Sequence, residues 1–422
     1  MSNLTLGLSP ARTNAIAVGP YRFSLVLVVL TCALTPAYVK RFHFGFYPTT
    51  VLEIAIVLTV VVFAIESWRQ RTQVEWKSPF TIPAILFLVA GPVSILVAPQ
   101  PVKALGLFRA YLVEPIALFV VITTAATNRR RALLVLGGLA IAGAAVAIPN
   151  ALVVLEAARH HTLNLAGAPP VVIYTTQNAV ALFCIPLIAV AASLALYVRD
   201  RRERLISVAV LLVTGAGTLL SFSRAGYLAL AVLALLLGAT HPRRWILVPA
   251  VLIVGAAVSR IPPVASRLGH EVDFADPNNS LVERYQLWKA TLRMLRDHPV
   301  FGSGLSGFAD TVARYRRGDV FTDRLIYPHN ILLNFWTETG LLGLAAFTWI
   351  VVAGLSLCWL AWRSASPGWR PIELGIFLAL VAIIVHGLVD VPYWKNDLST
   401  EFWVLLAVGW AGVRWGGQDV EA

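Results

Sequence analysis

Long apolar runs recur along this chain of 422 residues and constrain its fold more than any other feature. The composition is 58% hydrophobic and 13% charged, whereas soluble domains contain about 45–50% apolar and about 25% charged residues. A helix crosses a bilayer with about 17–25 apolar residues, and on that scale the chain divides into about twelve such segments. The sequence therefore predicts an all-α integral membrane protein with about twelve transmembrane helices.

The expected spans fall in two groups, separated by one long polar stretch. Residues 1–260 are expected to hold transmembrane helices 1–9, residues 261–328 a large loop, and residues 329–422 transmembrane helices 10–12. The expected helices lie near residues 22–39, 48–66, 80–98, 104–125, 132–155, 176–198, 205–221, 225–240, 245–260, 331–362, 371–390 and 398–414.

Basic residues in alternate short loops predict the orientation, because cytoplasmic loops are enriched in Lys and Arg. Such residues lie in the loops that contain Arg69, Arg129–Arg131, Arg199–Arg204, Arg243 and Arg363. Both termini fall on the same side and are expected in the cytoplasm, with the 261–328 loop outside, in the periplasm of a Gram-negative cell. The net charge of +12 is explained by these loops, and no basic run is long enough to bind nucleic acid.

The large loop is expected to contain an amphipathic helix. Ser280 and Glu283 have the spacing of a capping box, and Pro299 would end the helix after about His298. A surface helix with an apolar stripe lies on a bilayer, and helical geometry places Arg284 with this stripe, away from the basic face. The stripe consists of Leu281, Tyr285, Trp288, Leu292 and Leu295.

Arg224 lies in a short outer turn, Ser223-Arg224, between two apolar runs. An ionisable residue at membrane depth indicates function, although a snorkelling interfacial anchor is the alternative. Because a guanidinium group bonds phosphate oxygens in pairs, Arg224 and Arg284 together are suited to clamp a pyrophosphate.

His329 follows Pro328 where the polar loop returns to an apolar helix. The positive end of a helix dipole disfavours an imidazolium ion, and a neutral imidazole can accept a proton from a hydroxyl group. Asn330 would orient the imidazole or bind the acceptor. Glu338 lies on the opposite helix face, too far to orient His329, and is expected to brace a neighbouring helix.

Other polar residues inside the expected spans are as consistent with structural pairing as with catalysis: Glu114 beside Arg109, Asn178, His386 and Asp390. The chain has no Asp-x-Asp and no His-Glu-x-x-His motif, so neither a metal nor another cofactor is expected. The glycines Gly302, Gly304 and Gly307 match a dinucleotide-binding pattern, but no strand precedes them, and a tight turn is expected instead.

Taken together, these residues resemble the O-antigen ligase/Wzy superfamily. The resemblance covers residues 175–345, namely Asn178, Ser223-Arg224, Arg284, Trp288, Asp297-His298-Pro299, Gly302-x-Gly304, His329-Asn330, Glu338 and Gly340. It implies a GT-C-like glycosyltransferase that acts without a metal and with inversion at the anomeric carbon. The glycan donor would be undecaprenyl pyrophosphate-linked O-antigen at the periplasmic face of the inner membrane, within the lipid bilayer. In a ligase the acceptor is lipid A–core oligosaccharide.

By the same resemblance, Arg224 and Arg284 would hold the pyrophosphate and His329 would be the catalytic base. Asn330, Asn178, Ser223 and Glu338 would support them. Two alternatives remain open. One is an O-antigen polymerase, a class that tends to have two substantial outer loops, whereas only one is large here. The other is a lipid or sugar transporter, which would be expected to show internal repeats and broken midplane helices.

Overall fold

The computed structural model describes residues 21–45, 47–164, 169–261, 264–265, 269, 279–316 and 325–417. Parts of the expected 261–328 loop and the two ends of the chain therefore lie outside the described residues. Each of the twelve expected spans contains a helix. These helices are α1 (Arg22–Ala33), α2 (Val51–Gln70), α3 (Thr81–Val97), α4 (Pro101–Phe108) with α5 (Glu114–Ala125), α6 (Arg129–Arg159), α7 (Gln177–Tyr197), α8 (Arg201–Leu220), α9 (Arg224–Thr240), α10 (Arg244–Val258), α14 (Ile331–Ser364), α15 (Arg370–Gly387) and α16 (Asn396–Trp415).

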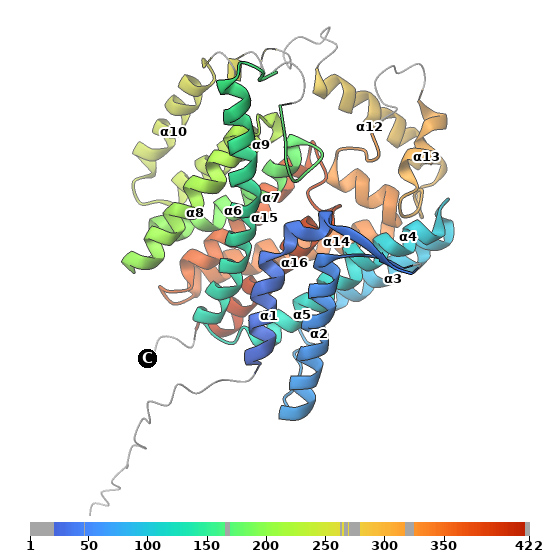
Figure 1. Cartoon of the computed structure of the whole chain (residues 1–422), viewed down its shortest axis with the longest axis horizontal. Coiled ribbons are helices and arrows are strands. Elements are labelled where there is room, and N and C mark those ends of the chain that lie inside the picture. Colours follow the sequence, from blue (N-terminus) through green and yellow to red (C-terminus); the bar gives the residue numbers. More distant parts are fainter. Residues whose placement is uncertain are drawn as a thin grey trace, which may run out of the picture.

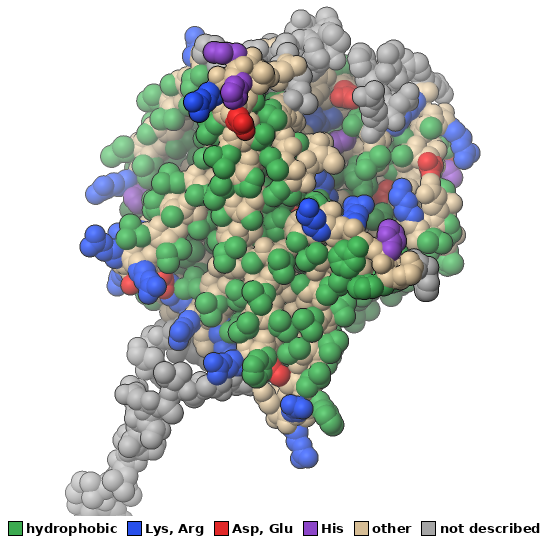
Figure 2. Space-filling view, viewed as in Figure 1, with side chains coloured by type: hydrophobic (Ala, Val, Ile, Leu, Met, Phe, Trp, Pro, Cys, Tyr) green, Lys and Arg blue, Asp and Glu red, His purple; other side chains and the backbone are tan. Residues whose placement is uncertain are grey.

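Among the described residues, 7 helices are long and apolar enough to cross a membrane. They are α2, the continuous segment Pro101–Ala125, α6, α7, α8, α14 and α15, and four further apolar helices are shorter. Hydrophobic side chains cover the middle of the molecular surface, and many Lys and Arg side chains gather toward its lower end (Figure 2). A mostly helical membrane protein is thus confirmed, while the expected number of about twelve crossings stays a prediction.

The N-terminal region departs from the expected helices. The first span, expected over residues 22–39, ends at Ala33 and continues as a 3-10 helix over Thr35–Val39, where Pro36 interrupts the α-helical hydrogen bonds. A hairpin of β1 (Arg41–Phe44) and β2 (Tyr47–Thr50) precedes α2, with Arg41 opposite Thr50. Residues 48–50, expected to be helical, are therefore a strand, and Thr50 caps α2 by accepting a hydrogen bond from the Glu53 amide.

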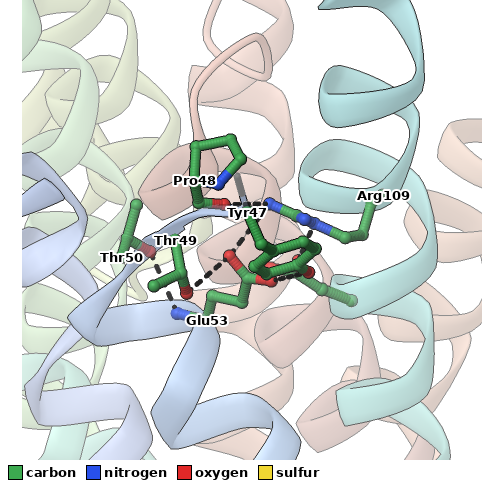
Figure 3. Close-up of polar contacts among 7 residues, drawn as sticks. Tyr47, Pro48, Thr49, Thr50, Glu53 and Arg109 are labelled. Carbon is green, nitrogen blue, oxygen red and sulfur yellow. Dashed lines mark hydrogen bonds and ion pairs between the residues drawn. The ribbon is translucent and has the colours of Figure 1, made fainter. Parts of the chain in front are cut away.

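Arg109 joins this hairpin to the helices beside it (Figure 3). Its guanidinium group lies 2.9 Å from Glu53 Oε2 and 3.1 Å from Glu114 Oε1, and it stacks over the Tyr47 ring at 4.6 Å. Arg109 also begins a π-helical turn, Arg109–Val113, between α4 and α5. Arg109 and Glu114 thus form an ion pair. Structural pairing is one of the two roles that the sequence left open for them, the other being catalysis.

Helices α7, α15 and α16 form the centre of the bundle, and α14 packs against α15 and α3. Nearly every residue of α7 between Ala179 and Leu194 is buried. The start of α1, the end of α2 and the end of α16 lie at one end of the molecule, and α12 (Ser280–Asp297) and α13 (Phe308–Val312) lie toward the other (Figure 1). The first and last described helices thus have their outer ends at the same end of the molecule, and the orientation in a membrane stays a prediction.

The helix expected in the large loop is α12, and its end at Asp297, before Pro299, matches the prediction. Its N-cap was predicted wrongly. Asn279, not Ser280, accepts hydrogen bonds from the Leu281 and Val282 amides, both at 3.0 Å. A capping box between Ser280 and Glu283 is therefore absent from this helix.

The buried face of α12 also differs from the predicted stripe. Leu281, Tyr285 and Leu292 are 43%, 56% and 46% exposed. The face that packs on α13 and on Trp336 of α14 consists of Leu287, Ala290, Thr291, Met294 and Leu295. The stripe of large side chains thus faces mostly away from the protein, and its contact with a bilayer stays a prediction.

The segment after Pro299 is a tight turn, as expected, and it packs against a break in α14. Gly302 and Gly304 have φ angles of +66° and +76°, and Gly340 of α14 has a φ of +66°. A Cβ atom on Gly302 would lie 2.3 Å from the Thr337 carbonyl oxygen, and one on Gly340 would lie 2.4 Å from the Val300 oxygen. Glycine is therefore required on both sides of this contact.

Candidate active site

His329 directly precedes Asn330, the N-cap of α14, and has a backbone conformation that residues other than glycine rarely adopt. Its φ angle is +48°, and such positions persist only where the surroundings impose them. Here the preceding residue is anchored, because the Trp288 indole of α12 donates a 2.9 Å hydrogen bond to the Pro328 carbonyl oxygen. The imidazole is 23% exposed, so a substrate can reach it.

Asp390, in the turn between α15 and α16, holds the His329 ring. Asp390 Oδ1 lies 3.1 Å from His329 Nδ1 and also accepts a 2.9 Å hydrogen bond from the Val391 amide. Asp390 Oδ2 accepts a 3.2 Å hydrogen bond from the Asn178 side chain of α7. With Nδ1 bonded to a carboxylate, Nε2 is the nitrogen that can accept a proton.

The Asp390 carboxylate is held in its charged form. Burial alone would raise its pKa, but the hydrogen bond from His329 and the nearby charges of His329, His386 and Arg284 keep the pKa below its ordinary value. A charged Asp390 can both orient His329 and stabilise the imidazolium ion that forms when the ring accepts a proton.

The two arginines predicted to bind phosphate lie in the same region as His329. Burial raises the pKa of Glu283 on α12, while the charges of Arg284, His329 and Arg224 lower it. Arg224, Arg284 and His329 therefore all lie close enough to Glu283 to influence its carboxyl group. The molecular surface is hollowed between the part that carries α6 and α9 and the part that carries α12, with basic and histidine side chains visible in the hollow (Figure 2).

The two arginines lie near the starts of two helices. Arg224 is the first residue of α9, after Ser223, whose hydroxyl group accepts a 3.1 Å hydrogen bond from the Gly226 amide. Arg284 Nη1 donates a 2.6 Å hydrogen bond to the Ser280 hydroxyl group, and its buried Nε has no partner among the described residues. The buried Nε of Arg284 thus lies against the protein, although the apolar stripe with which helical geometry grouped Arg284 faces mostly away from it.

Several helices begin at this site. Asn178 lies in the first turn of α7, Arg224 begins α9, Arg284 lies near the start of α12, and His329 precedes α14. The N-terminal end of a helix carries a partial positive charge and unpaired amide groups. Together with two guanidinium groups, these helix ends make the site suited to an anion such as a diphosphate.

Asn330 does not hold the imidazole in the structure, and its other expected role, binding of the acceptor, stays a prediction. Its side-chain oxygen caps α14 through the amides of Leu332 and Leu333, at 3.1 and 3.0 Å. Its side-chain nitrogen donates a 3.0 Å hydrogen bond to the Leu388 carbonyl oxygen. Asn330 therefore ties the start of α14 to the end of α15, which keeps His329 and Asp390 together.

Glu338 lies away from His329, as predicted. It braces the turn after Pro299, whereas the sequence predicted that it would brace a neighbouring helix. It is fully buried, and its carboxylate accepts a hydrogen bond from the Ser306 amide. The same turn is held by the Ser303 amide and hydroxyl group, which both donate to the Thr337 carbonyl oxygen, at 2.7 and 2.9 Å. Glu338 thus supports the fold of the loop.

Lys395, the N-cap residue of α16, is a further cation near Asp390. Its ammonium group lies 5.2 Å from the centre of the Tyr174 ring. Burial lowers the pKa of Lys395, while the charges of Asp397 and Asp390 raise it.

Within the described part of the chain, no group of three His, Cys, Asp or Glu side chains is placed to hold a metal ion. The groups that do converge are a histidine held by a carboxylate, two arginines and several helix N-termini. This set can take a proton from a hydroxyl group and stabilise negative charge on a phosphate leaving group.

Comparison with known proteins adds one finding. Residues 209–348 match a family model described as O-Antigen ligase. The match contains Arg224, Arg284 and His329, and it leaves Asn178 and Asp390 outside. No curated protein matches the chain.

Proposed function

We propose that this chain, whose residues 209–348 belong to the O-antigen ligase superfamily, is itself an O-antigen ligase. It would transfer O-antigen glycan from undecaprenyl pyrophosphate to a hydroxyl group of lipid A–core oligosaccharide. The observation that carries this proposal is the 3.1 Å contact of His329 with Asp390, in the same region as Arg224 and Arg284. A base and a diphosphate clamp are the two requirements of glycan transfer from this donor.

In the proposed reaction, His329 Nε2 takes the proton of the acceptor hydroxyl group while Asp390 stabilises the imidazolium ion. The hydroxyl oxygen attacks the anomeric carbon, and the bond from that carbon to the diphosphate oxygen breaks on the opposite side, which inverts the configuration. The leaving diphosphate keeps the bonding electrons, and Arg224 and Arg284 offset its charge. No metal ion takes part in this proposal.

Both substrates are lipids, so the site has to lie at a membrane interface. The site lies at the end of the bundle where α12 is found, opposite the start of α1 and the end of α16 (Figure 1). With the basic loops in the cytoplasm, this end faces the periplasm from the bacterial inner membrane, and both termini face the cytoplasm.

The test is reconstitution of the purified protein in vesicles with lipid-linked glycan and one of two acceptors. A ligase joins the glycan to lipid A–core and gives a product of one glycan per acceptor. A polymerase, the alternative within the superfamily, gives longer lipid-linked glycan without lipid A–core. Movement of intact donor across the vesicle membrane, with no glycosidic bond formed, would contradict both and indicate a transporter.

A further inference from the structure

A second cavity opens on the flank of the molecule, away from His329. It has a volume of about 500 Å³ and lies between the α3–α4 turn, the end of α12 and the segment after α13. Its polar lining includes Asp297, His298 and Arg314, and its apolar lining includes Val300 and Phe301. The segment that lines it packs on Thr337 of α14, eight residues beyond His329, or about 12 Å along the helix. The cavity is thus separate from the candidate active site.

An apolar groove on α14 continues from this cavity. The groove has a volume of about 520 Å³ and is lined by Leu341, Leu344, Ala345, Thr348, Trp349 and Val352. The two spaces adjoin, because the Leu341 amide donates a 2.9 Å hydrogen bond to the Val300 carbonyl oxygen. From Leu341 to Val352 the helix rises about 16 Å, close to half of the roughly 30 Å hydrocarbon core. The groove therefore has the length of one leaflet.

The charges of the cavity are mixed. Arg314 is exposed and forms no ion pair within the described residues. Asp297 ends α12, and its carboxylate is fixed by a 2.8 Å hydrogen bond from the Tyr315 hydroxyl group. The C-terminal end of a helix carries partial negative charge, so Asp297 and the end of α12 attract a cation while Arg314 attracts an anion. A ligand with both charges fits this cavity.

We propose that the cavity and the groove together bind one phospholipid whose headgroup carries a primary ammonium group. The phosphate contacts Arg314, the ammonium group contacts Asp297, and an acyl chain lies along α14 from Leu341 to Val352. A diphosphate would need more than one arginine and would be repelled by Asp297, so the glycan donor is a poor occupant.

This binding would couple the lipid to the active site through α14. The turn that lines the cavity packs against the Gly340 break, and His329 directly precedes Asn330, the N-cap of α14. A bound phospholipid would hold the turn, α3 and α14 together at the place where the helix is broken.

Native mass spectrometry of the full chain in detergent tests this proposal. The protein is mixed with equal amounts of phosphatidylethanolamine and phosphatidylglycerol that have the same acyl chains, with no glycan donor or acceptor present. We expect one tightly held lipid with a severalfold preference for phosphatidylethanolamine. Asp297→Asn should abolish this preference, and Arg314→Gln should reduce the retention of both lipids. Arg296→Gln, an exposed residue of α12 outside the cavity lining, is the control and should behave like the wild type.

A second measurement tests whether an acyl chain of the bound lipid lies in the groove beside Trp349. Phosphatidylethanolamine with brominated acyl chains should quench tryptophan fluorescence less in Trp349→Phe than in the wild type. Equal retention of the two lipids by the wild type, or an unchanged preference in both Asp297→Asn and Arg314→Gln, would overturn the proposal. Because no glycan is transferred in either experiment, failure here is distinct from failure of the proposed ligase activity.

Discussion

At the residue scale, the pairing of His329 with Asp390 is the feature that sequence reasoning missed. Both residues stood out, because each is an ionisable group beside an apolar run. Their contact spans 61 positions and depends on how the turn after α15 folds back over the start of α14. No local pattern encodes that turn, and helical geometry predicted only that Arg284 lies apart from the basic face of its helix.

Asp390 should stabilise the protein in a pH-dependent way. Its pKa in the folded protein lies below the ordinary value of about 3.9, so its charged form adds stability above that pH and the gain is lost as the pH falls through the folded pKa. We expect Asp390→Asn to lower the melting temperature at neutral pH, with a difference from wild type that shrinks below about pH 4. Thermal unfolding in detergent over a pH series measures this, with the exposed Asp310→Asn as control. A difference independent of pH would contradict the assignment.

Arg224→Lys separates charge from geometry. Lysine keeps the positive charge but loses the planar pair of donors that matches phosphate oxygens. We expect transfer to fall by about tenfold or more, equivalent to about 1.4 kcal/mol, with weaker binding of the lipid diphosphate. Initial rates over a range of donor concentrations measure this effect. Wild-type rates in the Lys variant would exclude paired phosphate bonding at Arg224.

At the element scale, the helices were predictable and their ends were less so. The lengths of the apolar runs indicated all twelve helical segments. The N-cap of α12 was not predictable, because Asn279 and Ser280 are both favourable N-cap residues and only the folded backbone selects Asn279. The hairpin over residues 41–50 was missed, because Tyr47 and the β-branched Thr49 and Thr50 directly precede an apolar run and read as its beginning. On α12, small residues such as Ala290 allow close packing, so the buried face does not follow the largest side chains.

The glycine contact between the turn and α14 gives a prediction at this scale. Gly302→Ala should destabilise the protein, because its Cβ atom would lie 2.3 Å from the Thr337 carbonyl oxygen and its φ is +66°. We expect a loss of about 1–3 kcal/mol. Gly137→Ala on α6 is the control, since a Cβ atom there meets nothing within 4 Å. Equal thermal stability of the two variants would contradict this account of the turn.

At the scale of the whole molecule, hydropathy predicted a helical membrane protein but not how the helices pack. The centre is formed by α7, α15 and α16, although α16 contains the buried acidic residues Asp397 and Glu401 and is less apolar than α7 and α15. Their burial depends on contacts with several other helices, which one-dimensional patterns do not contain.

The proposed orientation can be tested with single cysteines. Cys32, Cys184 and Cys358 are buried, so an added exposed cysteine should be the main site of labelling. We expect Arg296→Cys on α12 to react with a membrane-impermeant maleimide added to the periplasmic side, and Arg202→Cys at the start of α8 to react only after the membrane is permeabilised. The reverse pattern would place the site in the cytoplasm and exclude the proposed substrates.

The most direct test of the central claim is glycan transfer by His329→Ala. The purified variant is reconstituted with lipid-linked glycan and lipid A–core, beside the wild type and the control His43→Ala, which alters an exposed histidine of the hairpin. Because His329 is proposed to take the acceptor proton, transfer should fall by about 10²–10⁴-fold, while folding and donor binding persist and the control keeps the wild-type rate. Transfer by His329→Ala at the wild-type rate would contradict the account.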